Sequence, residues 1–239
     1  FASNMIIDSV LINNVSHSFT HENDLLIIDY EFQEAFNQNY DISALIYYSG
    51  EPDDGTFVRP SFYNGSLMIF HYSLSEPYSA KYWFPCKQVL SDKADSSYFF
   101  ITVDEDLKAG SNGILAQTEE LENGQVKYKW INNMPINFYL ISFSVGNYMD
   151  YSFNVELENF ETDVLVQNYI PNKDEYLSEN QYYIHQIEEM LVLLSDLWGI
   201  YPHHSQKYGH CIAPLGGGME HQTMTTLGYF DFRLVLHEL

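Results

Sequence analysis

Short segments rich in β-branched and aromatic residues follow one another through the first 170 residues. Several alternate apolar and polar positions, as in Val126-Lys127-Tyr128-Lys129-Trp130, which gives a strand one dry face and one wet face. Turn sequences such as Asn64-Gly65 and Glu122-Asn123-Gly124 separate these segments. The pattern predicts strands at residues 5–11, 25–32, 44–48, 67–72, 98–103, 126–130, 138–145, 153–157 and 164–169. Many short strands without intervening helices indicate an antiparallel, sandwich-like β domain.

The hydrophobic period changes after Pro171. Apolar residues then recur at helical spacing: Ile184, Ile187, Leu191, Leu194 and Trp198. Ser178 with Gln181 has the form of a capping box and predicts the helix start, while Gly199 predicts its end. A short strand at 212–213, a glycine loop and a second helix ending at Leu239 are expected to follow. Strands first and helices afterwards predict two domains, at residues 1–170 and 171–239.

Composition narrows the possible partners of this chain. Of its 239 residues, 46% are hydrophobic, so a substantial core is expected. The formal net charge of −23 repels phosphate backbones and anionic lipid, which argues against nucleic-acid binding. This charge keeps a surface soluble, or it draws cationic peptides into a cleft. No apolar run approaches the roughly 18 residues of a membrane span, and the sequence does not indicate a cellular compartment.

The final residues, His237-Glu238-Leu239, have the form of the first half of an H-E-x-x-H zinc motif. Imidazole is a good zinc ligand, and a neighbouring carboxylate can activate zinc-bound water. Adjacent helical residues point about 100° apart, so His237 could reach a metal while Glu238 faces the water. By itself the tripeptide is better explained as a fraying helix end with a solvated glutamate.

A glycine run precedes this helix by about twenty residues: Gly216-Gly217-Gly218-Met219-Glu220-His221. Glycines allow a backbone to lie close beside an extended ligand and to pair with it as an added strand. A glutamate directly after them can meet a positive group, such as the amino terminus of a peptide. The alternative is a flexible surface loop. The remaining histidines, including His203-His204, are more simply explained as packed or solvated.

These residues together resemble the aminopeptidase-N-like zinc metallopeptidases, whose signatures are G-x-M-E-N followed by H-E-x-x-H. Upstream segments also resemble the family: Glu76-Pro77 through Phe84-Pro85-Cys86, residues 134–148, and Leu197-Trp198-Gly199-Ile200-Tyr201-Pro202. The resemblance therefore extends over residues 75 to 239 and implies a saddle-like amino-terminal β-sandwich followed by the α+β start of a thermolysin-like catalytic domain.

The resemblance also implies roles for individual residues. His237 would be the first zinc ligand, Glu238 the general base, and Glu220 the anchor for the α-amine of a peptide substrate. Gly217, Gly218, Met219 and His221 would complete the substrate-binding segment. His221 stands where the family has asparagine, and Leu74 stands where the family often has a glutamine that binds the substrate amine.

The implied function is a zinc aminopeptidase in which the remaining zinc ligands lie outside the 239 residues. We therefore expect this chain to bind zinc weakly, to lack peptidase activity and to self-associate through uncovered apolar surface. Two alternatives stay open: a non-catalytic β-sandwich that binds carbohydrate or protein, and an epoxide hydrolase of the same family.

Overall fold

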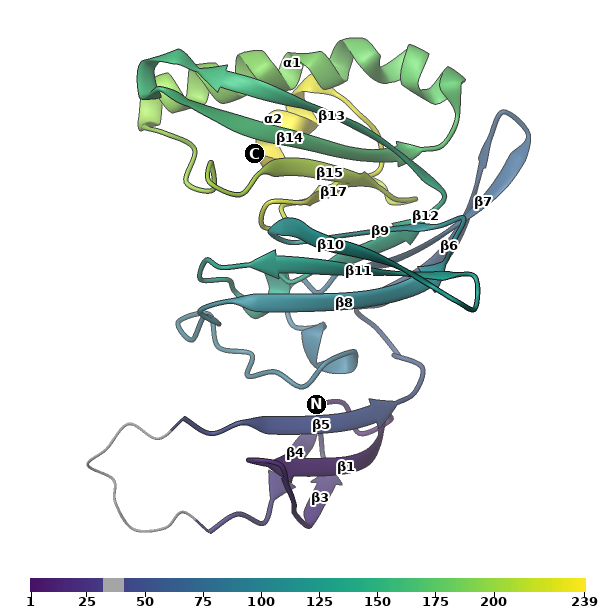
Figure 1. Cartoon of the computed structure of the whole chain (residues 1–239), viewed down its shortest axis with the longest axis vertical. Helices are drawn as coiled ribbons and strands as arrows, with labels where there is room; N and C mark the ends of the chain where they lie inside the picture. Colours follow the sequence, from purple (N-terminus) through teal and green to yellow (C-terminus); the bar gives the residue numbers. More distant parts are fainter. Residues whose placement is uncertain (32–40) are drawn as a thin grey trace.

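The computed structural model describes residues 1–31 and 41–239. Figure 1 shows three stacked tiers: a small amino-terminal body, a β-sandwich, and a sheet covered by helices. The first tier has a sheet of order β2-β1-β5 and a hairpin β3-β4. Its strands are β1 (Ile6–Ile12), β2 (Val15–Ser16), β3 (Phe19–Glu22), β4 (Leu25–Ile28) and β5 (Ala44–Ser49). The strand expected at 25–32 ends at Ile28, and Phe32 lies outside the described residues.

The middle tier is a sandwich of two antiparallel sheets. One sheet, of order β6-β7-β12-β9, contains β6 (Thr56–Tyr63), β7 (Ser66–Ser73), β12 (Phe143–Gly146) and β9 (Lys108–Ser111). The other, of order β10-β11-β8, contains β10 (Ile114–Leu121), β11 (Gln125–Asn132) and β8 (Ser97–Asp104). The alternation predicted for β11 is confirmed, because Val126, Tyr128 and Trp130 are buried between less buried neighbours. Trp130 Nε1 donates a hydrogen bond of 2.9 Å to the Ala109 carbonyl and so joins the two sheets.

The third tier is a five-stranded mixed sheet of order β13-β14-β15-β17-β16. Its elements are β13 (Tyr148–Leu157), β14 (Thr162–Pro171), α1 (Asp174–Trp198), β15 (Tyr208–Ile212), β16 (Gly218–Met219), β17 (Thr225–Leu227) and α2 (Phe232–Glu238). Alternation along β14 and β15 divides the sheet's residues between two cores. Val166 packs with Ile187 and Leu191 of α1, whereas Tyr169 and Cys211 join the core of the sandwich. The mainly β architecture followed by an α+β portion is thus confirmed.

The third-tier sheet crosses the domain boundary expected at residues 170 and 171. Strands β13 and β14 form an antiparallel hairpin, and β14 then pairs in parallel with β15 from the other side of that boundary. Parallel pairing across a connecting helix is a long-range contact that local periodicity does not report. We propose that the division between the domains lies near residue 147 instead.

Two local predictions are wrong. Helix α1 begins at Asp174, four residues before the predicted cap, and Ser178 Oγ donates to the Glu175 carbonyl inside the helix. Asp174 and Glu175 place negative charge in the first turn, where the helix dipole favours it. The helix does end at Gly199, as predicted. The segment expected as one strand at 138–145 is a 3₁₀ turn, η2 (Phe138–Leu140), followed by β12.

An apolar groove of about 570 Å³ lies between the end of α1 and the end of α2. Leu191, Leu194 and Leu236 line it together with Trp198, which is 81% exposed. Exposed apolar surface of this kind favours association, and self-association of the chain stays a prediction. Among the described residues, helices with both the length and the apolar character needed to traverse a bilayer are absent.

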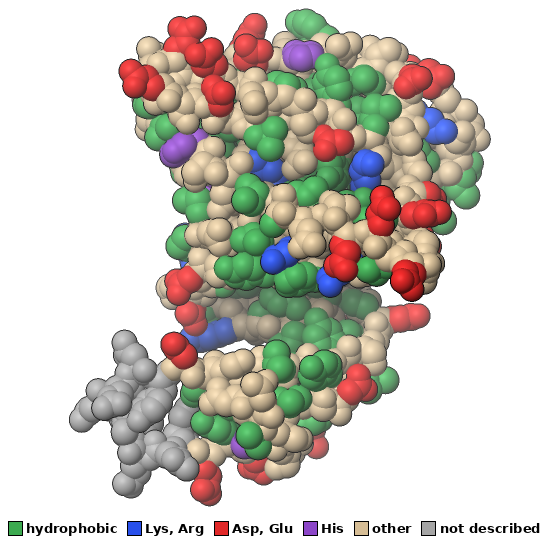
Figure 2. All heavy atoms as spheres, in the orientation of Figure 1, with side chains coloured by type: hydrophobic (Ala, Val, Ile, Leu, Met, Phe, Trp, Pro, Cys, Tyr) green, Lys and Arg blue, Asp and Glu red, His purple; other side chains and the backbone are tan. Residues whose placement is uncertain are grey.

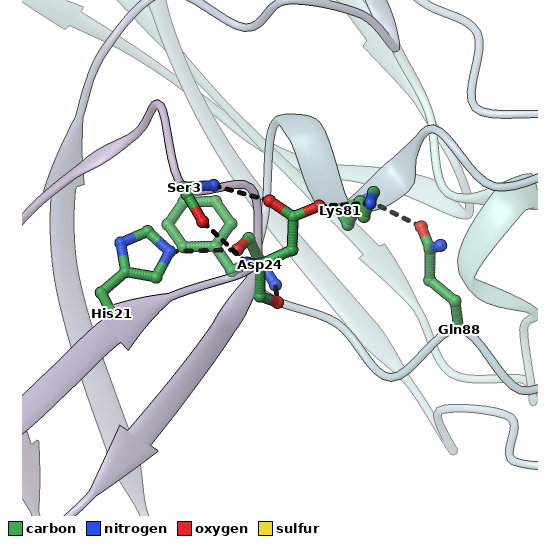
Figure 3. A network of polar contacts seen from close by, with 6 residues as sticks. Ser3, His21, Asp24, Lys81 and Gln88 are labelled. Carbon is green, nitrogen blue, oxygen red and sulfur yellow. Dashed lines mark hydrogen bonds and ion pairs between the residues drawn. The ribbon is translucent and has the colours of Figure 1, made fainter.

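A polar network ties the first tier to the sandwich (Figure 3). The Asp24 carboxylate accepts hydrogen bonds from the Ser3 amide at 2.9 Å and from Lys81 Nζ at 2.5 Å. The Lys81 amide donates to Gln88 Oε1 at 2.9 Å. Hydrogen bonds from the Lys81 side chain and from the Ser3 amide stabilise the Asp24 carboxylate and lower the pKa of Asp24 to about 2.

This ion pair predicts a dependence of stability on pH. A carboxyl whose pKa is depressed by folding contributes stability that is present above its unfolded pKa and lost as pH falls through its folded value. We expect the contribution of Asp24 to disappear between about pH 4 and pH 2. Urea unfolding at several pH values measures it, and Asp24→Asn is the comparison. An identical pH profile for the variant would contradict the expectation.

Candidate functional site

The glycine run forms the edge of the third-tier sheet. Strand β16 pairs with β17 on one side only, with Gly218 opposite Leu227 and Met219 opposite Thr226. The Gly228 amide extends this pairing by donating to the Gly217 carbonyl at 2.8 Å. Within the described part of the chain no strand pairs with the other edge of β16. An extended peptide can therefore add to it as a further strand.

Helix α2 brings Glu238 against this edge strand. The Asp231 carboxylate caps the helix by accepting from the Arg233 and Leu234 amides at 2.9 and 3.2 Å. A Cβ built at Gly218 would lie 2.4 Å from Glu238 Oε1, so the carboxylate occupies the space that any other side chain at position 218 would need. A side chain at position 218 would therefore displace the Glu238 carboxylate from the place where it now lies.

Two other carboxylates act electrostatically on Glu238. Burial raises the pKa of the half-buried Glu238 carboxyl, the charge of Glu220 raises it further, His237 lowers it, and Glu76 adds a smaller rise. The pKa of Tyr139 is likewise raised, first by burial and then by Glu220 and Glu76. Glu76 follows β7 and Tyr139 lies in η2, so the sandwich contributes to this group. Neither residue was expected at the site; the Glu76-Pro77 pair was the available signal.

A cavity of about 230 Å³ lies between the 220–224 turn and the end of α2. Glu220, Glu238 and His221 line it, together with Tyr201 and Tyr208. Glu220 is exposed at its rim, whereas His221 is buried. The structure thus brings Glu220 and Glu238 together around one cavity, and Gly218 lies against Glu238.

His221 is packed inward as a neutral imidazole. Its Nδ1 lies 2.9 Å from Thr226 Oγ1, and its buried Nε2 has no hydrogen-bond partner. Burial lowers the pKa of His221 to about 3 because the charged imidazolium is poorly solvated there. Met219, next to it in sequence, is buried in the sheet. These two residues support the loop from within.

His237 is directed differently from Glu238. It is exposed and lines the apolar groove at the end of α1, not the cavity with Glu220. The described residues contain no group of three or more His, Cys, Asp or Glu side chains arranged to hold a metal ion. His203 and His204 instead lie beside Met134 Sδ and the Tyr201 carbonyl. Because a catalytic zinc takes about three protein ligands, these residues do not form a complete zinc site by themselves.

No protein-family model matches this chain, and no curated protein matches it in sequence. Solved structures match its fold. An M1 zinc metallopeptidase from Deinococcus radiodurans aligns with a TM-score of 0.76 and 21% identity, over 98% of this chain and 53% of that chain.

Ligand-bound structures align equally well. A mutant M1 zinc metallopeptidase from Deinococcus radiodurans, bound to a Tyr-Ser-Ala substrate, gives a TM-score of 0.75 and 21% identity. A two-domain M1 zinc metallopeptidase mutant bound to L-arginine gives 0.77 and 20%. Both alignments cover 98% of this chain and 53% of the other. The chain therefore has the M1 metallopeptidase fold over nearly its whole length and spans about half the length of those structures.

Proposed function

We propose that this chain is the amino-terminal part of a zinc aminopeptidase, which removes residues from the amino terminus of peptides. The observation that carries the proposal is that Glu220 and Glu238 line one cavity, while the Glu238 carboxylate also lies against Gly218 of the unpaired β16 edge. An edge strand supplies backbone hydrogen bonds to an extended peptide, and the carboxylates supply charge at its end. The fold shared with a peptidase structure bound to a tripeptide supports the same reading.

Glu220 is the proposed anchor for the substrate's α-ammonium group. It lies at the rim of the cavity, and its charge acts on Glu238 and Tyr139 nearby. Glu76 contributes a second negative charge from the sandwich. Leu74 cannot accept a hydrogen bond, so amine recognition depends on these carboxylates. The acidic side chains spread over the face in Figure 2, together with the net charge of −23, favour the approach of a cationic amine.

Glu238 is the proposed general base. Its partial burial and its carboxylate neighbours raise its pKa above the ordinary value of a carboxyl, which makes it a better proton acceptor. Gly218 leaves the space in which this carboxylate lies, directly beside the strand that would hold the peptide. His237 is the one proposed zinc ligand within the chain; zinc, when bound, would supply Lewis acidity at the scissile carbonyl.

The contact between Gly218 and Glu238 weighs against a purely non-catalytic sandwich. The function of such a module would not require the glycine loop and the terminal helix to be in contact. Here the Glu238 carboxyl group fills the space above Gly218. Hydrolysis of an epoxide by the same fold remains distinguishable only by substrate profiling of the full-length protein.

The proposal is tested by comparing this chain with the full-length product of the same gene. We expect the full-length protein to retain zinc after dialysis and to hydrolyse aminoacyl-4-nitroanilides. The 239-residue chain is expected to bind zinc weakly and to show no turnover, because His237 alone cannot hold a catalytic metal. Metal analysis measures the zinc bound by each protein, and the chromogenic assay measures its turnover.

Two outcomes would overturn the proposal. The first is robust turnover by the 239-residue chain after its mass has been verified. The second is a gene sequence without a histidine two positions after Leu239. His237→Ala is the control for zinc binding by the short chain and should abolish whatever weak binding it has.

A further inference from the structure

The turn at residues 111–113, between β9 and β10, is a buried contact between the sandwich and the third tier. Lys207 Nζ, fully buried, donates to the Ser111 carbonyl at 2.9 Å and to the Gly113 carbonyl. The same ammonium lies 4.2 Å from the centroid of the Trp130 ring. Three partners thus surround a group that has three N–H donors. The lysine holds both ends of the 111–113 turn.

The lysine is strongly desolvated in this position. Burial lowers the pKa of Lys207 to about 7, although the nearby Cys211 and Asp150 act in the opposite direction. An amine removed from water to this extent is tolerated because the carbonyls and the ring replace its solvent. Its contacts are therefore specific to the docked arrangement of the two tiers.

Asn112, at the centre of the turn, reaches the loop that follows Glu220. Its Nδ2 donates to the Gln222 carbonyl at 2.6 Å and to the Leu140 carbonyl at 3.0 Å. Its Oδ1 accepts from the Ser142 amide at 2.8 Å. Every hydrogen-bonding direction of this buried amide except one lone pair is thereby used. The side chain fixes the Gln222 backbone relative to the sandwich.

Gly113 holds the next residue of the same loop. Its amide donates to Thr223 Oγ1 at 2.7 Å, and that hydroxyl donates to the Gln222 carbonyl at 2.6 Å. Thr223 has a φ of 65°, in the left-handed region that β-branched residues disfavour. Such a conformation persists only where surrounding contacts impose it, and strained residues of this kind cluster at functional sites. The contacts from Gly113 and Asn112 impose it here.

The 220–224 turn is therefore held at two places. At its base, the His221 amide donates to the Met219 carbonyl at 2.8 Å, and the Met224 amide donates to the His221 carbonyl at 3.1 Å. At its apex, the sandwich holds Gln222 and Thr223. Glu220 lies two residues before Gln222, so a shift of the apex moves the Glu220 side chain. We propose that Asn112 and Lys207 are positioning residues that, through the 111–113 turn, hold Glu220 in place for the substrate amine.

We call the contacts of Lys207 with the 111–113 turn, and of Asn112 and Gly113 with Gln222 and Thr223, the clamp. The inference rests on the proposed function only for the role of Glu220, and the clamp itself is testable without activity. Hydrogen exchange of the 239-residue chain, followed by mass spectrometry, measures protection of residues 220–224. We expect Asn112→Ala to speed exchange there about tenfold while residues 184–191 of α1 stay unchanged. Thr223→Val, which removes the hydroxyl but keeps the shape, should act in the same direction and decides the matter if Asn112→Ala does not fold.

The matched control is Lys81→Met, which breaks the ion pair between the first tier and the sandwich and should leave residues 220–224 unaffected. Unaltered exchange at 220–224, or an increase of equal size in α1, would overturn the clamp. In the full-length protein, Asn112→Ala should raise KM for free-amine peptides about tenfold with little change in kcat. Faster exchange at residues 220–224 without that change in KM would support the clamp and count against the amine-binding role of Glu220.

Discussion

Replacing Glu220 by glutamine in the full-length protein is expected to lower kcat/KM for peptides with a free amino terminus about 30-fold. The reason is the loss of the charged acceptor that we propose for the α-ammonium group. A hydrogen bond to a charged partner contributes about 2 kcal/mol, which corresponds to roughly 30-fold in rate. Much of the loss should appear in KM, because the amine is bound before and during the reaction. Steady-state kinetics on a chromogenic aminoacyl substrate measure it.

The control separates the local charge from the charge of the whole molecule. Glu188→Gln removes the same charge from an exposed position on α1 and should leave kcat/KM unchanged. A second readout in the 239-residue chain is the pKa of Glu238, which Glu220→Gln should lower because a like charge is removed. Carboxyl carbon NMR titration follows it. Equal kinetics for both variants would show that Glu220 is not the amine anchor.

Alanine at position 113 is expected to destabilise the chain by about 4 kcal/mol, the upper part of the range for single substitutions. Gly113 has a φ of +78°, and a Cβ there would lie 2.0 Å from the Ile131 carbonyl oxygen. The obstacle is backbone in the neighbouring strand β11, which cannot turn aside as a flexible side chain can. Urea unfolding of the wild type and the variant gives the difference in free energy.

Gly124 offers a matched comparison for this substitution. Its φ of +74° is nearly the same, but nothing lies within 4 Å of a Cβ built there. Gly124→Ala should therefore incur only the left-handed backbone penalty, about 1 kcal/mol. The difference between the two losses in unfolding free energy gives the cost of the steric clash at position 113. Similar destabilisation by both would mean that the turn between β9 and β10 can shift, contrary to its proposed part in the clamp.

Edge strands show where sequence reasoning fails in this fold. Strands β6, β9 and β10 were not predicted, and each lies at the edge of its sheet. Pro60, opposite Ile69, lies within β6 and is tolerated because an edge strand needs hydrogen bonds on one side only. Strand β10 is largely exposed and polar, so it lacks the alternation that identified β11. Partial burial leaves β6 and β10 with a weak pattern, whereas β9 is short and nearly all buried.

Local patterns in the sequence were enough to predict the mainly β start and the helix that ends at Gly199, whereas the two segments proposed as the site were indicated by their resemblance to a peptidase family. The strands and this helix depend on residues close together in the chain, whose period and turn chemistry are set by backbone sterics. Tertiary structure alone decided that β13 and β14 join the third-tier sheet, that Glu220 and Glu238 line one cavity, and that Lys207 is buried beneath the 111–113 turn. These are contacts between distant segments, and a buried lysine or a clustered carboxylate leaves no trace in local periodicity. Their energy comes from burial and from charges brought together by folding, which only the packed chain defines.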